Sequence, residues 1–192
     1  DDGEVDLPLD ESDIDPVALV CPKEMTEYVL FVSHTWDFSP NRDLESMKVN
    51  GQTEPSSPCP FSTAGSTVIM EECHVPITNT GFIKTDAGNC DITSSGEALV
   101  TIEEASCDGG VITMTIVETA NPDVGSGAMN CPGASQPAFP YFPYSRTTRE
   151  FPIKVGGSTA SESANPDLSG QFMYNKTWDV QSEKLGSPLP GD

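Results

Sequence analysis

Two histidines, His34 and His74, are the side chains of this 192-residue chain best suited to general-base catalysis near neutral pH. A Ser-His-Asp arrangement would need one of them. His34 shares a face of an apolar segment with Leu30 and Trp36, where a histidine more often belongs to the core or its rim. The sequence has no GxSxG, HExxH or glycine-rich phosphate loop. Paired carboxylates for glycoside cleavage stay open among the 30 acidic residues, but we predict that the chain is not an enzyme and needs no cofactor.

A short polar stretch could hold a cation. Asp86, Asn89 and Asp91 surround Gly88 and carry hard oxygen ligands, and calcium takes roughly six to eight oxygens from such loops. The spacing differs from that of an EF-hand loop, and no bidentate glutamate follows it. An ordinary turn is the simpler interpretation, and a calcium site at these three residues is the alternative.

Asn175-Lys176-Thr177 is the only N-glycosylation sequon. In a strand, Asn175 and Thr177 would lie on the face opposite Tyr174 and Trp178, which leaves the acceptor exposed. We predict glycosylation at Asn175, with a chance occurrence of the sequon as the alternative.

Residues 139–144 (FPYFPY) form an aromatic and proline-rich segment. The prolines hold the backbone extended and remove hydrogen-bond donors. Exposed aromatic rings at this density favour a docking surface for a sugar, a peptide or another subunit. Alternatively, the segment covers the end of a core that the strands leave open. The candidate docking residues are Phe139, Tyr141, Phe142 and Tyr144.

Six cysteines are present, and none belongs to a CxxC or CxxxxC pair of the kind that zinc sites usually need. Such a set predicts three disulfides and a location outside the reducing cytosol. Among the possible pairings we favour Cys90–Cys107, because a strand lies between the two and either end could return to the other. The cysteines are Cys21, Cys59, Cys73, Cys90, Cys107 and Cys131.

The composition is strongly acidic, with 30 acidic against nine basic residues and a formal net charge of −21. Nucleic acid is excluded as a partner because a phosphate backbone requires patches of Lys and Arg, and anionic membranes are disfavoured for the same reason. The charge suits a saline or exposed habitat, with divalent-cation sites as the alternative. Because the chain starts at Asp1 and has no apolar signal segment or transmembrane run, we interpret it as the mature form of a secreted or cell-surface protein.

Short strands and many turns must position these residues, because the apolar content is 36% and there are 17 prolines and 16 glycines. No run has the 3.6-residue period of a helix. We predict an all-β fold, specifically an antiparallel β-sandwich with a β-barrel as the alternative, stapled by disulfides. The predicted strands are 27–38, 46–50, 67–73, 81–85, 98–104, 110–118, 148–155 and 170–181.

Residues 21–192 are predicted to form one domain with a proline-rich C-terminal tail. Two long connections within it, 56–66 and 120–144, are predicted as loops. A Glu-x-Ala-Asn-Pro-Asp motif occurs at 118–123 and again at 162–167. Asn-Pro-Asp favours a turn, and we interpret the recurrence as reused turn chemistry rather than a repeat fold.

Residues 1–20 form an acidic extended arm in which apolar residues alternate with acids and proline. The alternation indicates a strand with one apolar face. So acidic an arm buries too little apolar surface to order alone, and it must dock on its own domain or on a neighbour. Donated to a neighbouring sheet and repeated head to tail, it would build a filament. The predicted assembly contacts are Val5, Leu7, Leu9 and Ile14.

We therefore predict a secreted structural protein that polymerises with itself into an extracellular filament or surface layer through this arm. The alternative is a monomeric extracellular β-module that binds a ligand, such as a carbohydrate, through the aromatic segment. In that case the arm folds back on its own sheet.

Overall fold

The computed structural model describes residues 21–39, 47–64, 67–153, 157–164 and 172–182. These residues contain no helix, and hence none that could cross a membrane. The acidic arm with Val5, Leu7, Leu9 and Ile14 lies outside the described residues, as does the C-terminal tail. The described part contains β1 (Thr26–Phe38), β2 (Met47–Thr53), β3 (Pro58–Ala64), β4 (Thr67–Ile69), β5 (Cys73–Thr85), β6 (Gly88–Asp108), β7 (Val111–Cys131), β8 (Ala134–Pro137), β9 (Ser145–Pro152), β10 (Ser158–Ala164) and β11 (Phe172–Ser182).

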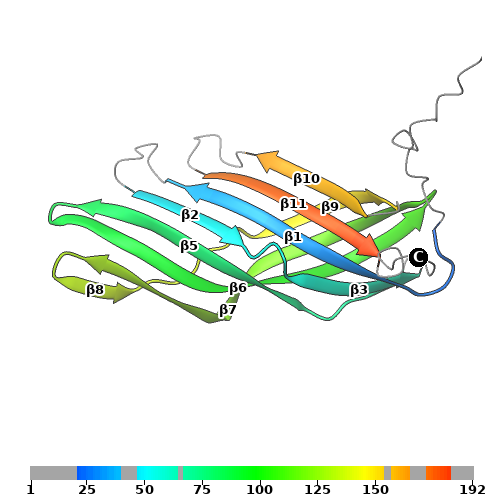
Figure 1. Ribbon diagram of the computed structural model, residues 1–192, viewed down its shortest axis with the longest axis horizontal. Helices are drawn as coiled ribbons and strands as arrows, with labels where there is room; N and C mark the ends of the chain where they lie inside the picture. Colours follow the sequence, from blue (N-terminus) through cyan, green and yellow to red (C-terminus); the bar gives the residue numbers. More distant parts are fainter. Residues whose placement is uncertain (1–20, 40–46, 65–66, 154–156, 165–171, 183–192) are drawn as a thin grey trace, which may run out of the picture.

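Antiparallel pairing joins these strands into one sheet with the order β10-β11-β1-β2-β5-β6-β7-β8. Three strands pair off this path: β3 with the first half of β1, β4 with β3, and β9 with the first half of β7. Figure 1 shows an elongated molecule whose longest strands run along its long axis. The predicted all-β antiparallel fold is confirmed.

The hydrogen-bonded ladder does not close within the described residues. There, β10 pairs only with β11, and β9 pairs only with β7. β9 and β10 approach each other, and the ion pair between Arg149 of β9 and Glu162 of β10 joins them through side chains. The described strands therefore form an open sheet, which establishes neither the predicted sandwich nor the alternative barrel.

The core lies on one face of this sheet and follows the predicted alternation. In β1 the residues that share this face are buried from Tyr28 to Trp36, and Phe38 at the end of the strand is partly buried. In β11 the same is true of Lys176, Trp178 and Val180. The longest strands, β6 and β7, contribute a further set of alternating core residues: Ala98, Val100, Ile102, Ile112, Met114 and Ile116. The two-residue period thus reports burial correctly in these strands.

The two predicted loops contain strands, so this part of the prediction is wrong. β3 lies within 56–66, and the second half of β7 and all of β8 lie within 120–144. Pro58 and Pro60 precede the part of β3 that pairs with β4, so they lie where its outer edge has no partner among the described residues. Proline is tolerated at such an edge because no ladder donor is needed there.

The turn predicted at 118–123 is present inside β7 as an irregularity of the strand. The register with β6 shifts between the Ala98–Ala120 and Gly96–Gly125 pairs, so several residues of β7 bulge opposite one of β6. The backbone N–H of Asp123 donates to Asn121 Oδ1 at 3.1 Å, which closes a local Asx turn. The second copy of the motif extends beyond the described residues.

All six cysteines form disulfides, as predicted, but the favoured pairing is wrong. The bonds are Cys21–Cys107, Cys59–Cys73 and Cys90–Cys131. Cys90 and Cys107 lie near opposite ends of the 21-residue strand β6, which extends for roughly 60 to 70 Å at about 3.3 Å per residue. A strand between two cysteines therefore separates them.

Candidate functional site

A carboxylate is buried where four strands meet. Glu118 lies at the point where β7 leaves β9, opposite Ser145. His34 of β1 and Lys176 of β11 are cross-strand partners, and both side chains point into the core. Side chains of a strand point alternately to its two faces, and these polar residues stand at positions that face the core. Their burial therefore follows from their place in each strand.

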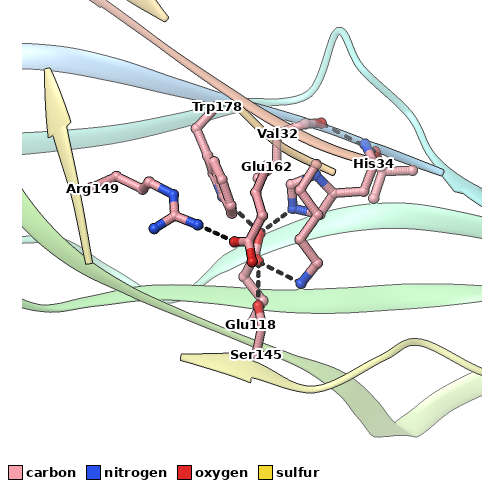
Figure 2. A network of polar contacts seen from close by, with 9 residues as sticks. Val32, His34, Glu118, Ser145, Arg149, Glu162 and Trp178 are labelled. Carbon is pink, nitrogen blue, oxygen red and sulfur yellow. Dashed lines mark hydrogen bonds and ion pairs between the residues drawn. The ribbon is translucent and has the colours of Figure 1, made fainter. Parts of the chain in front are cut away.

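Four side chains donate hydrogen bonds to Glu118, which is 0% exposed. The distances from its carboxylate oxygens are 2.5 Å to His34 Nε2, 2.7 Å to Ser145 Oγ, 3.2 Å to Trp178 Nε1 and 3.4 Å to Lys176 Nζ. Figure 2 shows His34, Ser145 and Trp178 converging on this carboxylate. The buried charge is thereby paired and hydrogen-bonded, as a buried ion must be.

These contacts determine the protonation state of Glu118 and act on the pKa of Lys176. Burial alone would raise the pKa of Glu118, but the hydrogen bond and charge of His34, aided by Lys176 and Ser145, hold it at about 2. Burial lowers the pKa of the Lys176 amine, and the nearby Glu118 opposes that effect. Glu118 is therefore ionised at neutral pH despite its position in the core.

A second group of polar side chains lies beside this carboxylate. Glu162 accepts hydrogen bonds from Arg149 and from the Tyr174 hydroxyl, and the Arg149 guanidinium lies 5.2 Å from the centre of the Trp178 ring. Burial and the bond to Glu162 raise the pKa of Tyr174. The Arg149–Glu162 contact (Figure 2) links β9 to β10, between which the described residues have no backbone ladder, and Tyr174 adds a side-chain contact from β11.

The arrangement around Glu118 stabilises a charge rather than activating a nucleophile. A catalytic relay requires the serine to bond the histidine, whereas Ser145 and His34 both bond the carboxylate. The side chains of His34 and Glu118 are at most 1% exposed, so a substrate could reach them only if the core opened. His74, the other histidine, is exposed and pairs with Glu97 and Glu72.

The aromatic-proline segment has an inner and an outer side. Phe142 is buried, and its ring packs edge-on against Trp36 with centroids 5.2 Å apart. Pro140 lies against the backbone of Gly96 and Gly125, where an added Cβ would come within 2.6 Å of its ring. Phe142 therefore belongs to the core, as one of the two interpretations of the segment predicts, and Pro140 anchors the segment on β6 and β7.

The outer side of the segment borders a hollow in the sheet. Phe139, Tyr141 and Tyr144 are exposed, by 82%, 46% and 67%. Phe139 and Tyr141 form one wall of a cavity of about 260 Å³, and burial raises the pKa of Tyr141. The rest of the lining comes from the sheet and from Ala138: Phe38, Met47, Val49, Asn79, Ile92 and Ser94.

A row of cross-strand neighbours creates this hollow. Trp36, Gly51, Asn79, Ser94 and Gly127 lie opposite one another in successive strands, from β1 to β7. A Cβ at Gly51 would lie 2.0 Å from the indole, so glycine lets the Trp36 ring lie flat on β2 and donate to Asn79 Oδ1 at 3.2 Å. Because no residue of the row beyond Trp36 is large, space remains above Asn79 and Ser94.

The other predicted sites stay predictions. Asp86 lies in the tight β5–β6 turn, and Asn89 and Asp91 are exposed residues of β6. No three His, Cys, Asp or Glu side chains of the described residues cluster as metal ligands would; the predicted calcium set includes Asn89 and stays a prediction. Asn175 is exposed on β11, in the orientation that glycosylation would require.

Sequence reasoning missed the residues that line the hollow from the sheet. Asn79 and Ser94 come from segments rich in Ser, Thr and Asn that alternate too weakly to reveal an inner face. The available signals were Phe38 in the predicted strand 27–38, and Met47 and Val49, two positions apart in the predicted strand 46–50. Comparison of the chain with protein-family models, curated proteins and solved structures found no match.

Proposed function

We propose that this protein is an extracellular β-module that binds a ligand in the hollow beside the aromatic-proline segment. The observation that carries the proposal is the hollow itself, in which apolar and aromatic side chains surround a few polar groups. Ligand sites commonly have this composition. The three disulfides are consistent with an extracellular location.

The aromatic segment suits this role because its inner side chains hold its outer side chains in place beside the hollow. Phe142 and Pro140 are held in the core and against two glycines, so Phe139 and Tyr141 are presented on an anchored backbone. A wall positioned before binding loses little conformational freedom when a ligand arrives.

Ligand screening tests the proposal. We expect some members of a fragment set containing neutral aromatics, aromatic acids and monosaccharides to shift the amide NMR signals of residues 92–94, Ala138, Phe139 and Tyr141 of the ¹⁵N-labelled full chain. Phe139→Ala should weaken such binding about 3- to 10-fold, the usual value of an aromatic contact. Tyr144→Ala is the matched control, because Tyr144 is also an exposed aromatic residue of this segment but does not line the hollow. Shifts confined to other surfaces, or none, would reject the proposal.

A second candidate function is self-assembly through the acidic arm. It is favoured by the Cys21–Cys107 bond, which fixes the residue that follows the arm to the end of β6, and by the open ladder of the described strands. An open edge offers backbone donors and acceptors to an added strand. The proposed contacts remain Val5, Leu7 and Leu9, with Ile14 beyond them.

Particle size tests assembly. We expect filaments or large oligomers by light scattering and negative-stain microscopy, and we expect them to dissolve when Val5, Leu7 and Leu9 are all replaced by Asp (the arm variant). Glu4→Ala/Asp6→Ala changes the other face of the same alternation and should leave the particles intact. A monomeric wild-type protein would contradict assembly.

A further inference from the structure

We infer that the hollow takes a small, neutral, mostly apolar molecule carrying one carbonyl or hydroxyl group, which binds Asn79 and Ser94. This inference rests on the proposed ligand-binding function and specifies its ligand class. It depends on the unpaired polar atoms of the hollow, on the absence of charge in its described lining, and on its size.

Two polar atoms at the hollow have no hydrogen-bond partner within the described protein. These are Asn79 Nδ2 and Ser94 Oγ, and their residues are only 2% and 7% exposed. Asn79 is held in one orientation because its Oδ1 accepts from Trp36 Nε1, which leaves the NH₂ group as a donor. Buried polar atoms are nearly always paired in proteins, so a ligand oxygen that accepts from Asn79 and bonds Ser94 would complete both.

The remaining lining selects against charge. No Asp, Glu, Lys or Arg is among the described residues that line the hollow, so an ion would lose its hydration without gaining a partner of opposite charge. The net charge of −21 adds a long-range repulsion of anions. A neutral ligand is therefore favoured over a carboxylate or a phosphate.

The shortage of polar groups also selects against a sugar. A monosaccharide carries several hydroxyl groups, and the described lining offers two unpaired side-chain partners among mostly apolar neighbours. Hydroxyls that enter an apolar site unpaired cost binding free energy. The volume of about 260 Å³ exceeds that of the engineered cavities of about 150 Å³ that hold benzene, so a substituted ring fits.

Acetophenone and cumene form a matched pair of probes, because they differ mainly in a carbonyl oxygen replaced by a methyl group. We expect acetophenone to bind the full-length protein more tightly than cumene and to shift the side-chain NH₂ signals of Asn79 in ¹H–¹⁵N spectra. Benzoate and methyl glucoside, titrated in parallel, should bind at least tenfold more weakly than acetophenone.

Variants test whether the Ser94 hydroxyl and the hollow itself bind the probe. Ser94→Ala should weaken acetophenone about fivefold, the equivalent of one hydrogen bond of about 1 kcal/mol, and leave cumene unchanged. Ser95→Ala is the control, because Ser95 is the exposed neighbour on the opposite face of β6. Ile92→Trp keeps both polar residues in the chain but fills the hollow, and it should abolish acetophenone binding.

The outcomes separate the ligand class from the function. Binding of methyl glucoside or benzoate in the hollow, in preference to acetophenone, overturns the inferred class and leaves ligand binding standing. Equal loss of acetophenone and cumene in Ser94→Ala also overturns it, because the hydroxyl would then act only through packing. Acetophenone binding that appears only in the arm variant would show that the arm itself occupies the hollow, and would likewise overturn the inference.

Discussion

Replacing Glu118 with leucine is expected to lower the free energy of unfolding by about 3–5 kcal/mol. The reason is the charge left behind: Lys176 is 2% exposed and has Glu118 as its ion-pair partner. His34, Trp178 and Ser145 would each lose a hydrogen-bond acceptor at the same time. The measurement is urea unfolding followed by the fluorescence of the two tryptophans, Trp36 and Trp178, both of which are buried.

Two further variants give this result its meaning. Glu150→Ala, at an exposed position of β9, should change stability by less than about 0.5 kcal/mol. Adding Lys176→Met to Glu118→Leu removes the orphaned charge, so the double variant should be more stable than the single one. If Glu118→Leu resembles Glu150→Ala, the carboxylate is not what holds the four strands together.

The same carboxylate should make stability sensitive to acid. Its pKa in the folded protein is about 2, below the ordinary value of 4.5, so its stabilising contribution is complete above about pH 4.5 and is lost as the pH falls toward 2. Glu118→Gln has no carboxylate at this position, so its stability does not depend on pH through this group. The stability gap between wild type and Glu118→Gln should therefore shrink by up to about 3 kcal/mol between pH 5 and pH 2, and a constant gap would contradict the depressed pKa.

Removing the Cys21–Cys107 bond by a double alanine substitution is expected to cost about 4–5 kcal/mol. The bond joins residues 86 positions apart, the widest separation of the three, and closing a longer loop removes more entropy from the unfolded chain. For a domain of this size the loss corresponds to a fall in Tm of about 10–15 °C. Calorimetry of the purified variants measures it.

The other two bonds supply the comparison. Cys59–Cys73 spans 14 positions and should cost about 3 kcal/mol on removal, with Cys90–Cys131, which spans 41, between the two. A reversed order, with Cys59–Cys73 the most damaging, would show that packing of the buried sulfurs outweighs chain entropy. Each variant keeps the other two disulfides, so the stabilities of the three variants can be compared directly.

Local patterns in the sequence predict the local structure well. Alternation in 27–38 and 170–181 predicts β1 and β11 and identifies the faces on which Trp36 and Trp178 are buried. The same alternation places Asn175 on the exposed face. The number and spacing of the cysteines predict that all of them form disulfides. These successes share a cause, because side-chain direction in a strand depends only on the backbone of that strand.

Prolines and small polar residues mislead where tertiary pairing supplies what the local sequence lacks. β3 and the second half of β7 form because neighbouring strands offer hydrogen bonds that compensate weak local preference. Strand preference depends strongly on such neighbours. A composition typical of loops therefore did not prevent a strand.

The candidate sites needed the tertiary structure most. His34 and Glu118 are 84 positions apart and meet only because β1 and β7 contribute to one core. Asn79 and Ser94 become the polar pair of the hollow through the register of β5 with β6, and Gly51 matters because Trp36 lies over it. The sequence by itself determined part of the strands, β1 and β11 most clearly, together with their buried faces and the oxidation of the cysteines. Register and strand order, which follow from the packing of the whole chain, decided which cysteines bond, which charges pair and where a ligand could enter.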